Sequence, residues 1–523
     1  MRAVLADRRP LRIPAYRRWW VASLVTAVGG SFSVVAVPAQ LYATTGSSAA
    51  IGGAAVVSFA GLLTGALGAG TLADRHDRRG VLLAAQLVLA VTYLGLWAHA
   101  EFGGPLGVLL ALVAGQGLTF GAISTVAGAV LPRLVPTELL AAANSLNSLV
   151  RYGGSILGPI LAGLLIPVAG LKTLYLCDAV ALLAVLWAVF RLPSLRPEPQ
   201  PAPSDAVRSR PRSADPDAVR RESQSSTDSD AVEPVSRPAD SDAVRPADSD
   251  AVEPEFRRAG AGSVRFGGFR YLLASPLLVA VLAVDLSAMV FGMPVALFPE
   301  LARHTYGDPA GGGPMLGLLY AAYPVGVFLA GLFSGTFTRA RHPGRMMAGA
   351  AIAWGGTVVL FGLAGHIALA LTALVLGGGV NFILSTHRNA ITQAHTDDAV
   401  RGRVQGMVTV VLFGGPQLAN LVHGTAGALI GPRPAIIVGG LLTMIAVAAV
   451  LGATPALREL ETVSPRQGAL ETVPARQEAL RTVSPREGPL GTASLRHDAL
   501  EIASTREEAL ETAVTRPERG ARR

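Results

Sequence analysis

The chain has 523 residues, of which 51% are hydrophobic and only 15% are charged. Globular proteins carry roughly 25% charged residues, so this composition argues against a soluble protein and favours one embedded in a membrane. The net charge of +8 does not point to nucleic acid as a partner, because the basic residues gather at the ends of apolar segments and in linkers. The one cysteine, Cys177, excludes an intrachain disulfide and a cysteine-based metal site.

Apolar segments of membrane-spanning length recur along the chain. Residues 81–100 hold no Asp, Glu, Lys or Arg, and a helix of about 20 residues rises roughly 30 Å, the thickness of the hydrocarbon core. We therefore predict an all-α membrane protein with twelve transmembrane helices. They fall near residues 16–41, 49–70, 81–100, 105–131, 139–166, 173–190, 276–301, 314–336, 346–364, 368–391, 404–430 and 434–452.

Two low-complexity stretches divide the chain. The first is rich in Pro, Ser, Asp and Arg and repeats the tripeptide Asp-Ala-Val, a composition that does not bury enough apolar surface to fold. The second repeats every ten residues, a period that fits neither an α-helix nor a coiled coil. We predict a six-helix half over 1–190, a disordered cytoplasmic linker over 191–262, a second six-helix half over 263–452 and a low-complexity cytoplasmic tail over 453–523. A role for the tail in docking another protein stays open.

The charges of the short loops set the expected orientation. Loops on the side of the N-terminus are rich in arginine, for example at Arg75 and Arg403, whereas those on the opposite side carry Lys172, Arg303 and Arg433. Positively charged loops are retained in the cytoplasm. We therefore predict a multi-pass protein of the cell membrane with both termini cytoplasmic.

The loop between the second and third predicted helices carries the strongest local motif, at residues 70–82. It resembles the loop motif of the major facilitator superfamily, with Asp77 in place of the usual glycine. A weaker copy at residues 335–345 lies in the equivalent loop of the second half, as two related halves predict. The residues that match the family motif are Gly70, Leu72, Ala73, Asp74, Arg75, Arg78, Arg79 and Leu82.

Asp74 is the residue of this loop with the clearest physical role. The eleventh helix is expected to begin on the same side, near Arg403, and a helix start carries a partial positive charge and unpaired N–H groups. We predict that the Asp74 carboxylate caps that start and latches the two halves together on the cytoplasmic side. Arg75, Arg78 and Arg79 would pair with nearby acids or lipid phosphates, or would only set the topology.

A second motif lies in the fifth predicted helix, where residues 153–163 read Gly-Gly-Ser-Ile-Leu-Gly-Pro-Ile-Leu-Ala-Gly. It resembles the antiporter motif of proton-coupled exporters in the same superfamily, matched at Gly154, Gly158, Pro159 and Gly163. Gly154 and Gly158 are one turn apart and offer a smooth face for close helix contact, and Pro159 can bend the helix. Ordinary small-residue packing is the alternative interpretation.

Several polar residues inside the predicted spans are candidates for coupling or substrate binding, because burying a charge in a membrane costs at least a few kcal/mol. Asp285 and Arg151 are expected near mid-depth. Asp285 could carry the proton, with Arg151 as its partner or as a contact for an anionic substrate; a structural ion pair is the alternative. We expect Asp178 and Arg388 to be structural or to lie at the membrane boundary. Asn420 is a further candidate.

Two predicted helices contain residues that interrupt a helix. The seventh carries Gly292 and Pro294, and the eleventh carries Gly415 and Pro416. Transporters place binding sites and hinges at interrupted helices near the midplane, so we expect both helices to contribute to the site. No pair of His or acidic residues has the spacing of metal ligands.

Stretches in both halves are similar to the enterobactin-exporter branch of the superfamily. They read VAVPAQLYATTGSS at 35–48, LVPTELLAAANSL at 134–146, FRYLLASPLL at 269–278, LGLLYAAYPVG at 316–326 and RGRVQG at 401–406. The resemblance implies proton-driven export of a siderophore or a comparable secondary metabolite. One departure is Gln116 in the fourth helix, where many antiporters of the superfamily carry a buried arginine that relays protons.

We therefore expect a secondary exporter rather than an enzyme, since the sequence holds no P-loop, nucleophile elbow or metal triad. The proton gradient would supply the energy and no cofactor is expected. The expected partners are a small-molecule substrate, protons and membrane lipid, not nucleic acid, and the expected state is a monomer. Multidrug or antibiotic efflux within the same superfamily is the alternative. A membrane scaffold or sensor that works through the repeat tail is a more distant one.

Overall fold

The computed structural model describes residues 7–191, 272–337, 342–396 and 400–460. Within these ranges the regular elements are α-helices and short 3-10 helices, so the predicted all-α class is confirmed. The predicted linker beyond Arg191 and the predicted tail beyond residue 460 lie outside the described residues, whereas residues 453–460 hold the end of a long helix and a short helix, Pro455–Glu459.

The first half contains six α-helices and two short 3-10 helices. They are η1 (Arg9–Arg12), α1 (Pro14–Gly29), α2 (Phe32–Thr45), α3 (Ser48–Arg75), α4 (Arg78–Phe102), α5 (Leu106–Leu134), η2 (Thr137–Leu139) and α6 (Leu140–Phe190). The described part of the second half continues the same architecture. Its elements are α9 (Pro276–Gly292), η6 (Val295–Leu297), α10 (Phe298–His304), α11 (Pro314–Leu332), η7 (Ser334–Thr336), α12 (Pro343–Leu363), α13 (Ile367–Ala394), α14 (Arg401–Ile430), α15 (Pro432–Ala453) and α16 (Pro455–Glu459).

Ten helical segments of the described chain are long and apolar enough to cross a membrane. One of them is α6, which covers two predicted spans and is interrupted at Gly170, whose φ of 76° and ψ of 163° are not helical. α14 covers the predicted span 404–430 but is not among the ten, and it carries polar residues such as Gln405 and Gln417. A multi-pass membrane fold is thus confirmed, and the number twelve stays a prediction.

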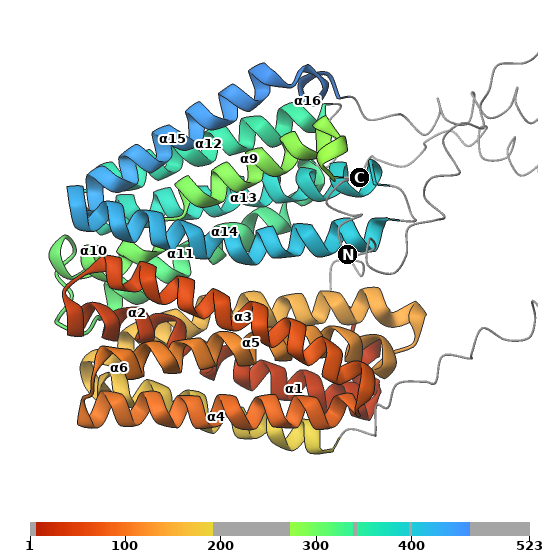
Figure 1. Cartoon of the computed structure of the whole chain (residues 1–523), viewed down its shortest axis with the longest axis vertical. Coiled ribbons are helices and arrows are strands. Elements are labelled where there is room, and N and C mark those ends of the chain that lie inside the picture. The colour runs from red at the N-terminus through yellow and green to blue at the C-terminus, as the bar shows by residue number, and fades with distance from the viewer. Residues whose placement is uncertain (1–6, 192–271, 338–341, 397–399, 461–523) are drawn as a thin grey trace, which may run out of the picture. The chain divides into compact units, whose positions relative to one another are not determined.

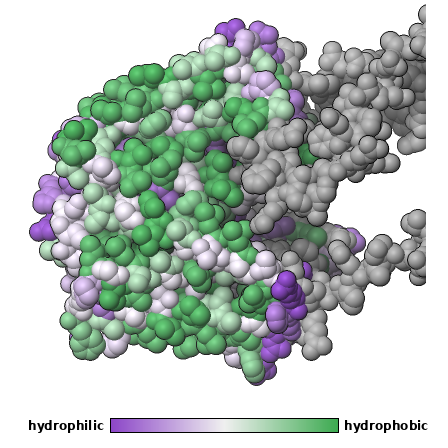
Figure 2. Space-filling model, viewed as in Figure 1, coloured by the Kyte–Doolittle hydropathy of each residue, from purple (hydrophilic) through white to green (hydrophobic). Residues whose placement is uncertain are grey.

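The exposed surface has the character of a membrane protein. Figure 2 shows hydrophobic side chains across the middle of the face in view, with hydrophilic ones gathered toward its edges. Large apolar side chains such as those of Leu67, Val91 and Val168 are 70%, 69% and 87% exposed. Exposed apolar patches of this extent are rare on soluble monomers and suit contact with lipid.

The first predicted span, 16–41, lies within one candidate membrane span, Pro14–Thr45, which contains a break. α1 ends at Gly29 and α2 begins at Phe32, with Gly30 and Ser31 between them. Glycine weakens a helix because it loses more backbone freedom on folding than other residues. The start of α2 is instead stabilised from another helix, as shown below.

The predicted interruption of the seventh span is confirmed. α9 ends at Gly292, and Met293 and Pro294 separate it from η6 and α10. The expected interruption of the eleventh span is not found, because α14 continues as a helix through Pro416. A proline inside a membrane helix is tolerated where neighbouring groups satisfy the freed backbone carbonyl.

Glycines set the packing of α3 against α5 inside the first half. A Cβ atom at Gly61 or Gly65 would collide with the backbone of α5, and one at Gly117 or Gly121 would collide with the backbone of α3. Small residues allow two membrane helices to approach at backbone distance. The two helices therefore form a fixed wall on one side of the first half.

The two halves meet along two helix pairs, α3 with α14 and α6 with α11; the first pair lies side by side in Figure 1. Both contacts are close. A Cβ atom at Gly52 would lie 2.7 Å from the carbonyl oxygen of Asn420, and one at Gly163 would lie 2.9 Å from the Cα atom of Gly317. The interface between the halves therefore depends on glycine.

Candidate functional site

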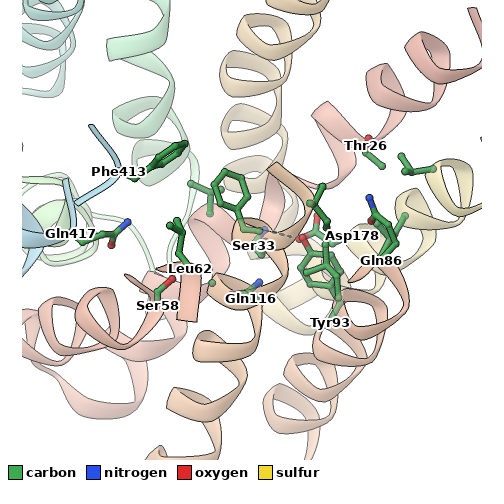
Figure 3. Close-up of a pocket in the computed structure, with 18 residues that line it drawn as sticks. Thr26, Ser33, Ser58, Leu62, Gln86, Tyr93, Gln116, Asp178, Phe413 and Gln417 are labelled. Carbon is green, nitrogen blue, oxygen red and sulfur yellow. Dashed lines mark hydrogen bonds between the residues drawn. The ribbon is translucent and has the colours of Figure 1, made fainter. Parts of the chain in front are cut away.

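A cavity of about 580 Å³ lies within the first half, and α14 of the second half contributes to its wall. Figure 3 shows hydroxyl, amide and aromatic side chains around it. Phe120 of α5 and Phe413 of α14 meet edge to face, with ring centres 6.1 Å apart. No Lys, Arg or His is among the described residues that line this cavity. Its polar lining consists of Thr26, Ser33, Ser58, Gln86, Tyr93, Gln116, Asp178 and Gln417.

Asp178 of α6 lies in the wall of this cavity and is fully buried (Figure 3). Its Oδ1 atom accepts a hydrogen bond from the N–H of Phe32 at 3.3 Å, and its Oδ2 atom accepts one from the N–H of Ser33 at 2.8 Å. These N–H groups belong to the first turn of α2, where a helix has no internal acceptors. Asp178 thus caps the start of α2 from a different helix.

A second buried polar contact holds α2 farther along its length. Tyr175, one turn before Asp178 on α6, donates a hydrogen bond from its hydroxyl to the Oε1 atom of Gln40 at 2.6 Å. The Nε2 atom of Gln40 lies 3.0 Å from Nδ1 of His99 on α4. Because buried polar side chains need partners, these contacts fix one face of α2 to α4 and α6.

The other buried acid of the described spans, Asp285, is paired with Arg388. The Nη1 atom of Arg388 lies 2.8 and 2.9 Å from the two carboxylate oxygens, and the side chains are only 6% and 2% exposed for Arg388 and Asp285. The remaining donors of Arg388 reach Oδ1 of Asn389. This arrangement matches the alternative of a structural ion pair between helices, here α9 and α13.

The suggested pairing of Arg151 with Asp285 is not found. Arg151 is exposed, its Nη2 atom lies 3.4 Å from Oγ of Ser148, and its guanidinium group stacks on Tyr152 at 5.7 Å. Sequence alone placed Arg151 and Asp285 at similar depth, and it could not show that α13 lies next to α9. Arg388 is the nearer cation.

A second cavity, of about 410 Å³, lies between the halves. Tyr152 and Ser155 of α6 form one side, and residues of α11 and α13 form the other. The hydroxyl of Tyr323 donates a hydrogen bond to Oδ1 of Asn381 at 2.9 Å. This cavity offers hydroxyl and amide groups to a ligand, as the first one does.

The glycines of the antiporter-type motif face two different neighbours. Gly154 faces α1 at Ala27, and Gly158 faces the break after α1 at Ser31, since Cβ atoms at these glycines would collide there. The carbonyl of Pro159 and the backbone of Gly163 instead meet α11 at Gly317. Through this motif, one part of α6 packs against its own half and the following part packs against α11 of the other half.

The loop motif is described except for the side chain of Asp74, and those of Arg401 and Arg403 at the start of α14 are not described either. The latch between Asp74 and α14 therefore stays a prediction. Asp77, in place of the usual glycine, has a φ of −61° and a ψ of 119°, an ordinary extended conformation that needs no glycine. Its carboxylate accepts a hydrogen bond from the N–H of Arg79 at 3.0 Å and so begins α4.

The arginines of this loop have separate environments. The Nη2 atom of Arg79 donates to the carbonyl of Phe190 at 2.5 Å, and its guanidinium group lies over the ring of that residue. A cation at the last carbonyls of α6 is stabilised by the negative end of the helix dipole. A Cβ atom at Gly70 would lie 3.9 Å from Cγ2 of Thr125, an ordinary contact. Arg75 is exposed, and the buried Nε atom of Arg78 has no hydrogen-bond partner among the described residues.

Contacts across the halves gather at the end where α2 and α10 lie, at the left of Figure 1. The hydroxyl of Ser48 donates to Oε2 of Glu300 at 2.5 Å, and both residues lie next to that end. Tyr42 packs edge-on against His304, with ring centres 6.2 Å apart. We call this region the closed end; it consists of Tyr42 and Ser48 of the first half with α10 and residues 305–313 of the second.

Asp308 supports the closed end from a loop outside the spans. Its carboxylate accepts hydrogen bonds from the N–H groups of Met315 at 3.2 Å and Leu316 at 2.8 Å, and so caps α11. Burial raises the pKa of this carboxyl group, while the same N–H groups act in the opposite direction. The cap uses the same chemistry as that of Asp178 on α2.

Polar side chains are exposed toward the opposite end of the spans. They include Asn144 and Arg151 on α6 and Gln405 and Thr409 on α14. Polar groups inside membrane spans face a water-filled space or a protein partner rather than lipid. The faces of α6 and α14 that carry them are therefore expected to meet water or protein rather than lipid.

Sequence reasoning missed four residues of the first half that this geometry brings forward: Gln40, Gln86, His99 and Tyr175. Their signal was visible, because each is a polar residue within an otherwise apolar segment. The predicted candidate Asn420 faces α3, where its backbone carbonyl meets Gly52. Its buried Oδ1 atom has no hydrogen-bond partner in the part of the chain that the structure describes.

Comparisons with known proteins agree with this architecture. The family model of the Major Facilitator Superfamily matches residues 19–419. The enterobactin exporter EntS of Shigella flexneri is 26% identical over 449 residues, which cover 83% of this chain and 92% of that protein. EntS of Escherichia coli strain SMS-3-5 is 26% identical over 460 residues, which cover 87% of this chain and 95% of that protein.

Solved structures show the same fold at low sequence identity. A bacterial homologue of the human lysosomal transporter Spinster, in an inward-facing and unoccupied conformation, aligns with a TM-score of 0.59 at 13% identity and covers 88% of this chain and 100% of its own. A bacterial homologue of the iron transporter ferroportin, in an inward-facing state, aligns with a TM-score of 0.57 at 15% identity and covers 86% and 99%. The chain belongs to the Major Facilitator Superfamily and is a membrane transporter, not an enzyme.

Proposed function

We propose that the protein is a secondary exporter that moves a siderophore, or a related secondary metabolite, out of the cell in exchange for protons. The observation that carries this proposal is the similarity to enterobactin exporters, which extends over more than nine-tenths of their length. The cavities add physical support. Their hydroxyl, amide and aromatic groups suit a molecule that combines hydrogen-bonding groups with rings.

The charge of the larger cavity favours the metal-free form of such a cargo. The described lining holds no basic side chain, and an anion that leaves water for a cavity without a cation loses hydration that nothing replaces. A metal-free siderophore with protonated phenols carries little or no charge, whereas its ferric complex is anionic. Export of the metal-free form is therefore the expected activity.

Transport in inverted membrane vesicles tests the proposal. With an imposed proton gradient, metal-free enterobactin should accumulate in the vesicles, and collapse of the gradient should abolish accumulation. Common drugs assayed in parallel would reveal multidrug efflux, the second candidate, which the mixed aromatic and amide lining also suits. If no compound showed dependence on the gradient, the proposed antiport would be wrong.

The proposed orientation places both termini in the cytoplasm. The exposed polar faces of α6 and α14 would then lie toward the cytoplasm, and the closed end would face outward, so that cargo enters from inside. We further propose that the transporter works as a monomer surrounded by lipid, with the proton gradient as its energy source and no cofactor.

Asp74→Asn should reduce export by at least about tenfold, an effect within the usual size of conformational coupling. The predicted cause is loss of the carboxylate that caps the start of α14 and holds the halves together on the cytoplasmic side. Vesicle transport and the amount of protein in the membrane should be measured together. Asp77→Asn is the matched control, because Asp77 caps α4 locally. Full export by Asp74→Asn would refute the latch.

A further inference from the structure

We propose that Asp178 carries the exchanged proton and that the half-helix α2 is the part of the protein that responds to it. This inference rests on the proton-coupled export proposed above and assigns the coupling to one residue. The observations behind it are the two buried acids of the described spans, the partners of each, and the contacts of α2 at both of its ends.

Asp285 is poorly placed to exchange a proton. Both of its oxygens contact Nη1 of Arg388, and both side chains are almost fully buried. Protonation of Asp285 would leave the guanidinium charge of Arg388 buried without a counter-charge, which is strongly unfavourable. The pair therefore holds α9 and α13 together in a fixed arrangement.

Asp178 has no such constraint. Within the described residues it forms no ion pair, and its partners are neutral: the N–H groups of Phe32 and Ser33 and the side chain of Ser33. It also lies in the wall of the 580 Å³ cavity, where a proton can arrive with water and leave when cargo enters. Removal of its charge would strand no buried cation.

A change of protonation at Asp178 acts directly on α2. The ionised carboxylate accepts two hydrogen bonds at a helix start, where the helix dipole favours negative charge. A protonated carboxyl group must donate its own O–H and keeps weaker hydrogen bonds, since those to an ionised group are roughly twice as strong as neutral ones. Protonation at Asp178 therefore loosens the cap and frees the start of α2.

α2 links this cap to the closed end. Ala39 in its middle faces Gly312 of the second half, with 3.7 Å between the Ala39 Cβ atom and the position of a Cβ atom at Gly312. Tyr42 near its end packs on His304, and Ser48 directly after it binds Glu300. A shift of α2 would therefore reach the contacts that shut this end.

The titratable groups that face Asp178 are few. Tyr93 of α4 and Tyr175 and Cys177 of α6 interact with its charge. α1, α2, α3, α5 and α14 contribute hydroxyl, amide and apolar side chains to the described lining of the cavity, but no charged group. Asp178 is thus the one group of this cavity wall, among the described residues, that ordinary changes of pH could titrate.

Reconstituted protein in vesicles with metal-free enterobactin as the probe provides the first test. In Asp178→Asn, the stimulation of transport by the proton gradient should fall by about tenfold, which is within the usual range of coupling between two sites. The detergent-solubilised variant should still bind the probe. Glu101→Gln is the control, since it removes a carboxylate that lies outside the cavity and the closed end, 2.6 Å from Lys172. It should keep the stimulation.

A second measurement needs no substitution at Asp178. In a Cys177→Ser background, which removes the one native cysteine, Ala39→Cys places a thiol where the native side chain is 2% exposed. Only the thiolate reacts with a maleimide, and its fraction falls as the pH is lowered, so labelling by a membrane-impermeant maleimide is normalised at each pH to that of a fully exposed control cysteine. This normalised labelling should rise severalfold as the pH is lowered without a gradient. Adding Asp178→Asn should make the normalised labelling independent of pH.

The outcomes separate this inference from the proposed function. If wild-type transport ignores the gradient for every probe, the proposed antiport fails. If wild-type transport responds and Asp178→Asn responds equally, antiport stands and the assignment to Asp178 is overturned. Normalised labelling of Ala39→Cys that does not change with pH overturns the role of α2. If Asp285→Asn lost the stimulation by the gradient and Asp178→Asn kept it, the proton site would be assigned to Asp285.

Discussion

Gly163→Ala should reduce transport by roughly tenfold or more while the protein still reaches the membrane. An added Cβ atom would lie 2.7 Å from the carbonyl oxygen of Gly313 and 2.9 Å from Cα of Gly317. Both are backbone atoms, so the helices α6 and α11 must separate. Overpacking of this kind costs about 1–3 kcal/mol. In a transporter that alternates between two states, this cost destabilises the state in which α6 and α11 make this contact.

Gly153→Ala is the matched control for this substitution. Gly153 lies on the same helix, and a Cβ atom there would have no neighbour within 4 Å. We expect its transport to be close to that of the wild type. The labelling of Ala39→Cys from the closed end should increase in Gly163→Ala, because that end can no longer shut fully. If Gly163→Ala transported cargo and was labelled to the same extent as protein with the native Gly163, the close contact between α6 and α11 would not be needed.

Features of the fold could be predicted from the sequence where they depend only on the residues of one segment. Apolar length marked the spans, and the Gly-Pro pattern around Pro294 marked the interruption between α9 and α10. The same reasoning failed at Pro416, where α14 continues. A proline breaks or bends a helix according to whether neighbours satisfy the freed carbonyl, and those neighbours belong to other segments.

The site shows the same limit. Asp178, Asp285, Arg151 and Arg388 could each be identified as charged residues within apolar spans. Their pairing could not be predicted, because it depends on which helices lie next to each other. Only the packing of α9 against α13 brings Arg388 to Asp285. The break between α1 and α2 has the same origin, since its stabilising acid lies on α6, more than 140 residues away.

Arg388→Ala should lower the stability of the protein by about 3–5 kcal/mol, the usual effect of removing one partner from a buried ion pair. The carboxylate of Asp285, on a side chain that is only 2% exposed, would be left without a counter-charge. Thermal unfolding of detergent-solubilised protein should show a markedly lower midpoint, and less protein should accumulate in the membrane.

The double variant Asp285→Asn/Arg388→Gln distinguishes a lost charge balance from a lost shape. It removes both charges and keeps two hydrogen-bonding side chains, so it should recover most of the stability lost in Arg388→Ala. Glu101→Gln provides a control at an exposed pair, because Glu101 and Lys172 lie 2.6 Å apart with side chains 32% and 48% exposed. Exposed pairs contribute about 0–1 kcal/mol, so this variant should unfold almost as the wild type does.

A functional readout completes the comparison. If the pair of Asp285 and Arg388 only holds α9 against α13, the double variant should retain export that depends on the proton gradient. Its structural role would then be separate from coupling, which we assign to Asp178. Recovery of stability without recovery of gradient-dependent export would contradict this division, and it would show that the charges on α9 and α13 take part in transport.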